Sequence, residues 1–105
     1  MSRYSIKNID LNEEKLKKIW EDCSPATSAL ISESGRYNFV YGLDHACGWF
    51  CQIVPLDENN HEIEEEEIDL DGMFTGFTGA ELGFLLNLFG GNPQHIELAY
   101  LDYGF

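Results

Sequence analysis

The sequence has no lysine or arginine over most of its length. All six of these residues lie within residues 1–36, and from residue 37 to residue 105 the only basic side chains are three histidines. Residues 1–36 contain as many acids as bases, so the formal net charge of −13 belongs to the later part. Such a surface repels nucleic acid and attracts a basic partner. The acids of the later part are Asp44, Asp57, Glu58, Glu62, Glu64, Glu65, Glu66, Glu67, Asp69, Asp71, Glu81, Glu97 and Asp102.

The sequence also lacks a long apolar run and an even set of cysteines. The longest apolar run, near residues 82–89, is too short to span a bilayer. Residues 1–7 have no signal-peptide pattern. An odd count of three cysteines favours a reducing compartment without disulfides. Anionic headgroups would repel so acidic a surface. We therefore expect a cytoplasmic protein that does not bind membranes.

Repeats and proline- or serine-rich linkers are absent as well. A chain of 105 residues is expected to form one domain with one core. Its content of 44% hydrophobic and 13% aromatic residues argues against disorder, despite the charge. The sequence therefore predicts a single acidic globular domain over residues 1–105.

Two segments have helical spacing. Asp10-Leu11-Asn12-Glu13 has the spacing of a capping box, and the apolar stripe after it predicts a helix over residues 11–22 that Pro25 ends. A second capping box, Thr78-Gly79-Ala80-Glu81, precedes another stripe, and Gly90-Gly91-Asn92-Pro93 supplies its stop. The stripes are Leu16, Ile19, Trp20 and Cys23 in the first helix and Leu82, Leu85, Leu86 and Phe89 in the second.

Other segments have strand patterns. Residues 29–33 and 36–42 flank a Ser-Gly turn and predict a hairpin. Residues 49–56 are rich in β-branched and aromatic side chains, residues 62–70 alternate weakly like an edge strand, and residues 94–101 form a last strand. The fold class expected is α+β, with a mostly antiparallel sheet of three to five strands packed by two helices. The glycine-rich residues 72–79 precede the second helix, and we expect them to cover the core with Phe74 and Phe77.

The acidic run over residues 62–71 is the main candidate for a functional surface. It is either a solvated face or a binding face, and the lack of nearby bases favours binding, because uncompensated charge steers oppositely charged partners. Carboxylates spaced by about 6–7 Å along two strands would resemble the phosphates of a nucleic acid. Tyrosines beside acids are favoured interface anchors. The predicted partner-binding residues are Asp57, Glu58, Glu62, Glu64, Glu65, Glu66, Glu67, Asp69, Asp71, Tyr41 and Tyr103.

Metal sites find little support in the sequence. Asp69-Leu70-Asp71-Gly72 begins like a calcium loop but lacks the later oxygen ligands. His45, Cys47 and Cys51, with Cys23 as a fourth ligand, could bind zinc, but no second pair completes the usual spacing. We expect no metal and no other cofactor.

Catalysis is equally weakly indicated. Cys47 with His45 or His95 has no glycine-framed nucleophile motif, and the surrounding acids disfavour a thiolate. The sequence has no P-loop and no serine elbow, and a chain of this length offers little room for a carboxylate-lined cleft. We therefore expect no catalytic residues and no enzyme.

Three functions remain open. The first is a small inhibitor or decoy whose acidic face occupies the basic, nucleic-acid-binding surface of a partner protein. Phage-encoded anti-CRISPR or anti-restriction proteins have this size and charge, which is an analogy of composition. The second is an immunity protein or antitoxin that neutralises a cationic toxin, and the third is a housekeeping protein whose acids only confer solubility. The sequence indicates neither the oligomeric state nor the partner's identity.

One prediction follows from the missing bases alone. The chain should bind neither DNA nor RNA directly, because residues 37–105 offer no lysine or arginine to neutralise phosphates. An electrophoretic mobility-shift assay at about 50 mM salt, where phosphate contacts are strongest, should show no shift. A clear shift by the purified protein would exclude the decoy hypothesis.

Overall fold

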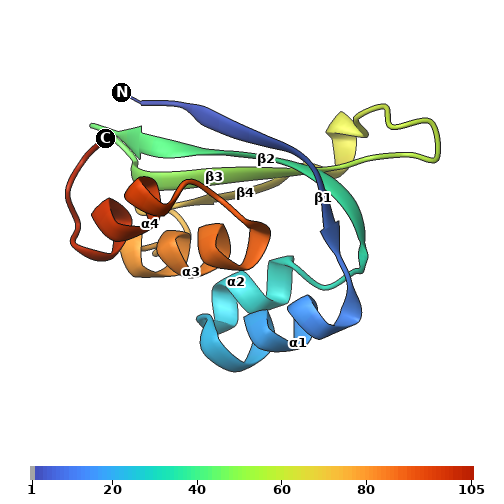
Figure 1. Cartoon of the computed structure of the whole chain (residues 1–105), viewed down its shortest axis with the longest axis horizontal. Coiled ribbons are helices and arrows are strands. Elements are labelled where there is room, and N and C mark those ends of the chain that lie inside the picture. The colour runs from blue at the N-terminus through green and yellow to red at the C-terminus, as the bar shows by residue number, and fades with distance from the viewer. Residues whose placement is uncertain (1) are drawn as a thin grey trace.

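A four-stranded antiparallel sheet with the strand order β1-β2-β3-β4 forms the centre of the protein in a computed structural model that describes residues 2–105 (Figure 1). The strands are β1 (Tyr4–Leu11), β2 (Gly35–Asp44), β3 (Gly48–Pro55) and β4 (Ile68–Asp71). Each strand pairs with the next one in the chain. The antiparallel sheet and its helices confirm the predicted α+β class, and β4 lies at one edge.

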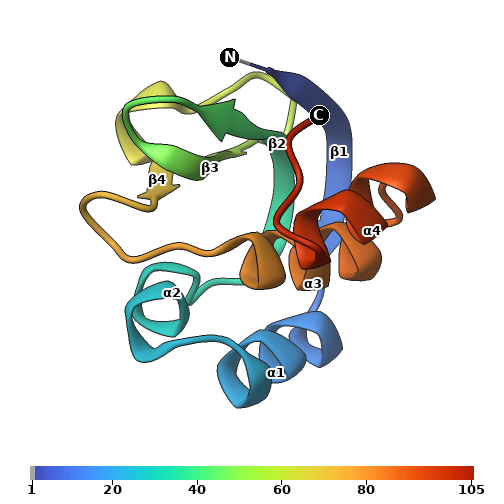
Figure 2. The same ribbon diagram turned by 90° about the vertical axis from the view of Figure 1, so that its left-hand side faces the viewer.

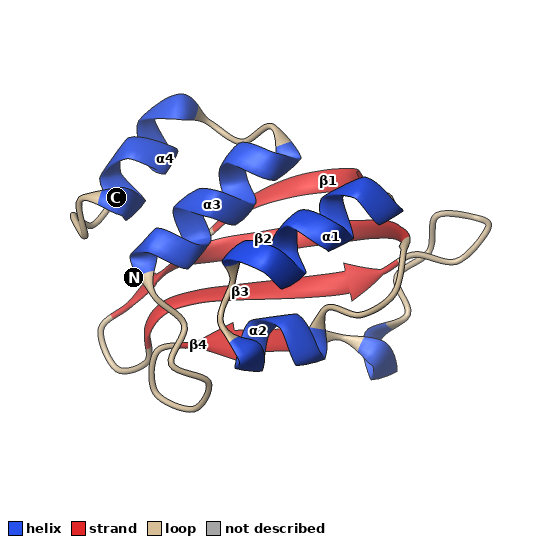
Figure 3. Ribbon diagram, turned by 90° about the horizontal axis from the view of Figure 1, so that it is seen from below, coloured by secondary structure: helices blue, strands red, loops and turns tan. Residues whose placement is uncertain are grey.

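The α-helices all cover the same face of this sheet (Figures 1 and 3). They are α1 (Glu13–Asp22), α2 (Pro25–Leu30), α3 (Gly79–Phe89) and α4 (Pro93–Tyr100), and the short 3-10 helix η1 (Glu64–Glu66) precedes β4. The two helices expected near residues 11–22 and after Thr78 are therefore accompanied by two more. Within residues 2–105, no helix combines the length and apolar character needed to span a membrane.

Alternate side chains of the strands form the sheet side of one hydrophobic core. In β2 and β3 these residues are Tyr37, Phe39, Tyr41, Trp49, Cys51 and Ile53, none of them more than 6% exposed. The period of two residues along each strand places these side chains on the helix-covered face. The helices contribute Leu16, Ile19, Leu82, Leu85, Leu86, Phe89 and Ala99.

The first strand was not predicted, because a bulge interrupts its alternation. Ile6 pairs with Phe39 whereas Ile9 pairs with Tyr37, so β1 has an extra residue between these pairs. Asn8 lies within the bulge at a φ of 57°, a left-handed conformation that asparagine tolerates better than most residues. The extra residue shifts the apolar positions of β1 out of a period of two. The helix that follows is capped by Asn12, whose side chain accepts a hydrogen bond from the Lys15 amide, and not by Asp10.

Two segments predicted as strands, residues 29–33 and 94–101, are wrong. Residues 29 and 30 end α2, and residues 94–100 belong to α4. In both helices a proline occupies the first turn, where its missing N–H is no loss. The preceding Ser24 and Asn92 cap these helices, accepting hydrogen bonds from the Thr27 and Gln94 amides. The helices before these prolines end as expected, and each proline also begins a new helix that was not predicted.

The predicted edge strand at residues 62–70 is only partly a strand. Its first half forms a bridge at Glu62 and the turn η1, and β4 pairs with β3 from Ile68 onward. The end of β4 is closed by its own loop, because the Asp71 amide donates to Thr75 Oγ1 at 3.0 Å and Thr75 Oγ1 donates to the Asp71 carbonyl at 2.9 Å. An edge strand blocked in this way is less able to pair with another chain.

A polar network joins α2 to the start of α3. The Glu81 carboxylate accepts hydrogen bonds from Thr27 Oγ1 at 2.7 Å, from Ser24 Oγ at 3.1 Å and from the Ser24 amide at 3.3 Å. Thr27 is 1% exposed. A carboxylate that lies between two helices is thus held by neutral donors.

Replacing Thr27 tests this network. Thr27→Val keeps the shape but leaves Glu81 without its shortest hydrogen bond, so unfolding in urea should require ~1–3 kcal/mol less free energy. Thr27→Ser, which keeps the hydroxyl, serves as the control and should lose less. A Thr27→Val variant as stable as the wild type would show that the network contributes nothing.

Candidate acidic interface

The acids that follow Tyr37 fall into two groups in the folded chain. Members of the first group accept hydrogen bonds from neutral donors: backbone amides, hydroxyls, a side-chain amide or an indole. They are Asp44, Asp57, Glu62, Asp71, Glu81 and Asp102. Members of the second group accept no hydrogen bond from a neutral donor among residues 2–105, and the two that contact each other, Glu67 and Asp69, are both acids. This group consists of Glu58, Glu64, Glu65, Glu66, Glu67, Asp69 and Glu97.

Three acids of the first group hold turns. Asp44 accepts from the amides of Ala46 and Cys47 at the β2–β3 turn, and these bonds lower the pKa of its carboxyl. Asp71 accepts from the Phe74 amide at 2.6 Å, after β4. Hydrogen bonds of this kind let aspartate stabilise a local turn of its own chain.

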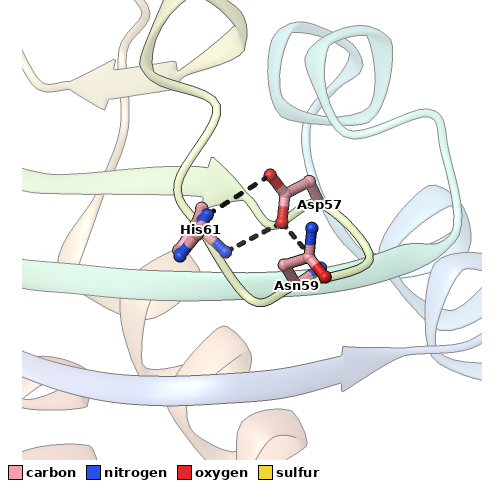
Figure 4. A network of polar contacts seen from close by, with 3 residues as sticks. All are labelled: Asp57, Asn59 and His61. Atoms are coloured by element: carbon pink, nitrogen blue, oxygen red, sulfur yellow. Dashed lines mark hydrogen bonds and ion pairs between the residues drawn. The ribbon is translucent and has the colours of Figure 1, made fainter.

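Asp57 performs the same task in the long loop after β3 (Figure 4). Its Oδ1 accepts from the amides of His61 and Asn59 at 2.9 and 2.8 Å, which lowers the pKa of the carboxyl. Its Oδ2 lies 3.9 Å from His61 Nδ1. Glu58 is exposed in this loop, which extends beyond the sheet (Figure 3). The structure thus gives Asp57 a local role, while Glu58 remains free.

The other acids of the first group hold parts of the fold that lie far apart in the chain. Glu62 accepts from Asn38 Nδ2 at 2.8 Å, and Asn38 Oδ1 in turn accepts from the amide of Asn8 in the β1 bulge. Asp102 accepts from the indole Nε1 of Trp49 at 2.6 Å. These residues were not recognised by sequence reasoning as structural, because their donors are neutral and distant in sequence.

The second group is concentrated beside one edge of the sheet. We call Glu64, Glu65, Glu66, Glu67 and Asp69 the acidic edge; all five are exposed and come from η1, β4 and the residue between them. Among residues 2–105 the ion pairs are Lys18–Glu14 and His61–Asp57, and neither includes the acidic edge. Its charge is therefore uncompensated by close pairing within the described chain.

Within the acidic edge, Glu67 and Asp69 influence each other's ionisation. The pKa of Glu67 is raised, first by a side-chain hydrogen bond with Asp69, then by partial burial and by the charges of Asp69 and Glu64, while Arg3 acts in the opposite direction. A raised carboxyl pKa means that ionising this group costs more in the folded chain than in the unfolded chain. The acidic edge thus retains its charge against a cost in stability.

The expected two-strand array of carboxylates is wrong. Asp69 faces Gln52 across the β3–β4 pair, and Asp71 faces Phe50, so β3 carries no acid in this register. Acids therefore form a single row on β4, and their neighbours Glu64–Glu66 lie in a 3-10 turn with a different spacing. A close geometric copy of a nucleic-acid backbone is absent from the described sheet, although the density of charge is present.

The predicted tyrosine anchors differ from each other. Tyr41 is wrong as a contact residue, because it is 3% exposed and its hydroxyl forms a 2.7 Å hydrogen bond with His95 Nδ1. The helix-covered side of a central strand places it in the core. Tyr103 is 63% exposed but follows α4, which lies toward β1 in Figure 3, whereas β4 is at the opposite edge.

The loop after β4 exposes apolar side chains that sequence reasoning placed in the core. Phe77 is buried as expected, but Phe74 is 80% exposed and Met73 is 60% exposed. The expectation for Phe74 is therefore wrong. Nothing in the glycine-rich pattern distinguishes the two phenylalanines, because their orientation depends on the hydrogen bonds to Asp71.

Two of the cysteines, Cys23 and Cys51, have thiols that resist ionisation. Burial, followed by the nearby acids Glu81 and Asp22, raises the pKa of Cys23 to about 12, and burial raises that of Cys51 well above its ordinary value. All three cysteines are free. Within residues 2–105, no three histidine, cysteine or acidic side chains converge as metal ligands would.

Comparisons with protein-family models, with curated proteins and with solved structures give no match for this chain. We therefore infer function from the acidic edge itself.

The pKa of Glu67 gives a prediction with a definite sign. A raised carboxyl pKa means that the folded chain binds protons more readily, so stability falls as pH rises through the folded pKa. Glu67→Gln should therefore raise the midpoint of thermal unfolding at pH 7, and this gain should disappear at a pH well below the ordinary carboxyl pKa. Glu97→Gln, an exposed acid on α4, is the control. A Glu67→Gln variant that is less stable than the wild type at pH 7 would contradict the repulsion.

Proposed function

We propose that this protein is a small non-catalytic inhibitor or decoy that acts by binding. Its acidic edge occupies the basic, nucleic-acid-binding surface of a partner protein, as phage-encoded anti-CRISPR or anti-restriction proteins do by analogy. The observation that supports this most directly is the group of five exposed carboxylates with no partner among residues 2–105. Uncompensated charge of this density accelerates encounter with a positively charged surface.

The division of the acids narrows the proposed surface. Asp57, Glu62 and Asp71 have hydrogen-bonding roles inside the chain, so their carboxylates are less available to a partner than those of the acidic edge. A partner's lysine or arginine would find Glu64–Glu67 and Asp69 free. Replacing these residues should therefore change binding more than folding.

The proposed site of action is the cytoplasm. Free cysteines, two of them with raised pKa values, are compatible with a reducing compartment. An immunity protein that neutralises a cationic toxin would use the same edge. The two functions differ in whether nucleic acid competes for the partner, and the experiment below separates them.

Removing the charge of η1 and its neighbour tests the proposal. The variant Glu64→Gln/Glu65→Gln/Glu66→Gln/Glu67→Gln should fold at least as stably as the wild type, because exposed like charges repel one another. Asp10→Asn/Glu21→Gln/Asp22→Asn/Glu97→Gln, with the same change of charge at exposed positions elsewhere, is the matched control. Immobilised wild-type and control proteins should retain a basic protein from a lysate of the source cell, and the first variant should not.

The retained protein then decides between the functions. Its association rate with the wild type should fall steeply as salt rises, and duplex DNA or RNA should displace it in a competition assay. Displacement by nucleic acid is expected for a decoy, whereas an unaffected complex with a toxin would favour the immunity protein. If the wild type, the Glu64–Glu67 variant and the control variant retained the protein equally at low and high salt, both the decoy and the immunity function would be contradicted. The acidic charge would then serve solubility only.

A further inference from the structure

We propose that the acidic edge is one part of a larger docking surface, whose occupant is a basic protein segment with exposed apolar side chains among its lysines and arginines. The other parts are the Phe74 loop, meaning residues 72–78, and a cavity beside Leu30 at the opposite end of β4. This inference depends on the proposed function. It adds that the partner is held by apolar contacts once the charges have brought it near.

The first observation is the exposure of the Phe74 loop next to the acidic edge. Met73 and Phe74 follow directly after the acidic strand β4, and 60% and 80% of their surfaces are exposed. Figure 2 shows this loop leaving β4 and extending to the side of the sheet before it returns to α3. A phenylalanine this exposed gains more from burial against a partner than any other side chain near the acidic edge.

The loop is also held in place by hydrogen bonds. Asp71 accepts from the amides of Phe74 and Phe77 at 2.6 and 2.9 Å, and the Gly72 amide donates to the Cys47 carbonyl at 2.9 Å. A Cβ on Gly72 would lie 2.9 Å from that same carbonyl oxygen, so the backbone approach requires glycine. An aromatic side chain on a tethered loop loses little conformational entropy on binding, which favours affinity.

The second observation is the cavity at the other end of β4. It encloses about 260 Å³ and is lined by Leu30, Tyr37, Pro55 and Ile68, with Glu33 and Glu66 also contributing. Both carboxylates raise the pKa of Tyr37, after burial, which places them near its hydroxyl. A lining that mixes aliphatic side chains with carboxylates and Ser32 suits the side chain of lysine or arginine, whose aliphatic part can be buried while its charge remains near solvent.

The spacing allows one segment to reach both ends. Ile68 lines the cavity and Asp71 immediately precedes the Phe74 loop, and these residues are the two ends of β4. Three residues of extended strand span about 10 Å. An extended or helical basic segment of ordinary length covers this distance, with the acidic edge beside it.

Charge identifies the occupant as a basic partner and not a second copy. Each copy carries a formal net charge of −13, and the acidic edge adjoins the apolar side chains. Joining two such surfaces would bring like charges together, which costs free energy at an interface. A basic segment removes the same repulsion and covers the same apolar surface.

Two synthetic peptides provide the probes. Both are about 12 residues long, enough to exceed the length of β4 when extended. One alternates lysine and serine, and in the other a pair of the serines is replaced by leucine. Isothermal titration should show that the wild type binds the leucine-containing peptide more tightly. Phe74→Ala should weaken that binding about tenfold and leave the lysine–serine peptide unaffected, as expected for an apolar anchor.

Controls separate this inference from the proposed function. Tyr103→Ala removes an aromatic side chain of 63% exposure outside the surface and should change neither affinity. Phe74→Ala that binds both peptides like the wild type would overturn the inference, while a loss of binding in the Glu64–Glu67 variant would still support the proposed function. If the Glu64–Glu67 variant bound each peptide as tightly as the wild type does, the proposed function would be overturned. A wild type that sediments as a dimer, and becomes monomeric with Phe74→Ala, would assign the loop to a second copy and overturn the inference.

Discussion

With no lysine or arginine beyond Arg36, the acids of the later part can seldom be neutralised by a nearby cation. Each must either accept hydrogen bonds from neutral donors or face solvent. Glu81 between α2 and α3, Asp102 at the Trp49 indole and Asp44 at the β2–β3 turn illustrate the first solution. A partly buried carboxylate such as that of Glu81 needs such donors, because an unpaired charge away from water is costly. The fold therefore depends on neutral hydrogen bonds to acids.

The remaining acids carry the functional argument. Once the structural carboxylates are set aside, the uncompensated ones are concentrated at η1 and β4, beside the exposed Phe74. The raised pKa of Glu67, set first by its contact with Asp69, means that ionising this one group costs more in the folded chain than in the unfolded chain. Electrostatic attraction and apolar contact have different roles in such a surface, since charge mainly sets the rate of encounter and apolar anchors mainly set the lifetime of a complex.

Sequence reasoning predicted the fold class, the helix after Thr78 and the strands at residues 36–42 and 49–56, because each segment has a regular period or composition and clear end signals, but the hairpin predicted between residues 29–33 and 36–42 is wrong. It failed where local chemistry admits two interpretations. Pro25 and Pro93 were interpreted only as stops: α1 and α3 do end before them, but Ser24 and Asn92 also cap new helices that begin there. The bulge at Asn8 concealed β1. Tyr41, expected at the surface, is buried, and Phe74, expected in the core, is exposed. Sequence patterns do not show which acids accept hydrogen bonds, because the donors come from distant parts of the chain, as Asn38 does for Glu62.

The central claim is that the acids divide into those that hold the fold and those that do not. Its most direct test is the free energy of unfolding in urea of two triple variants with the same change of charge. Asp44→Ala/Asp57→Ala/Asp71→Ala removes three acceptors of turn hydrogen bonds, whereas Glu64→Ala/Glu65→Ala/Glu66→Ala removes three free carboxylates. The account predicts a clear loss of stability for the first variant and none, or a gain, for the second. Equal losses, or a larger loss for the second, would contradict it.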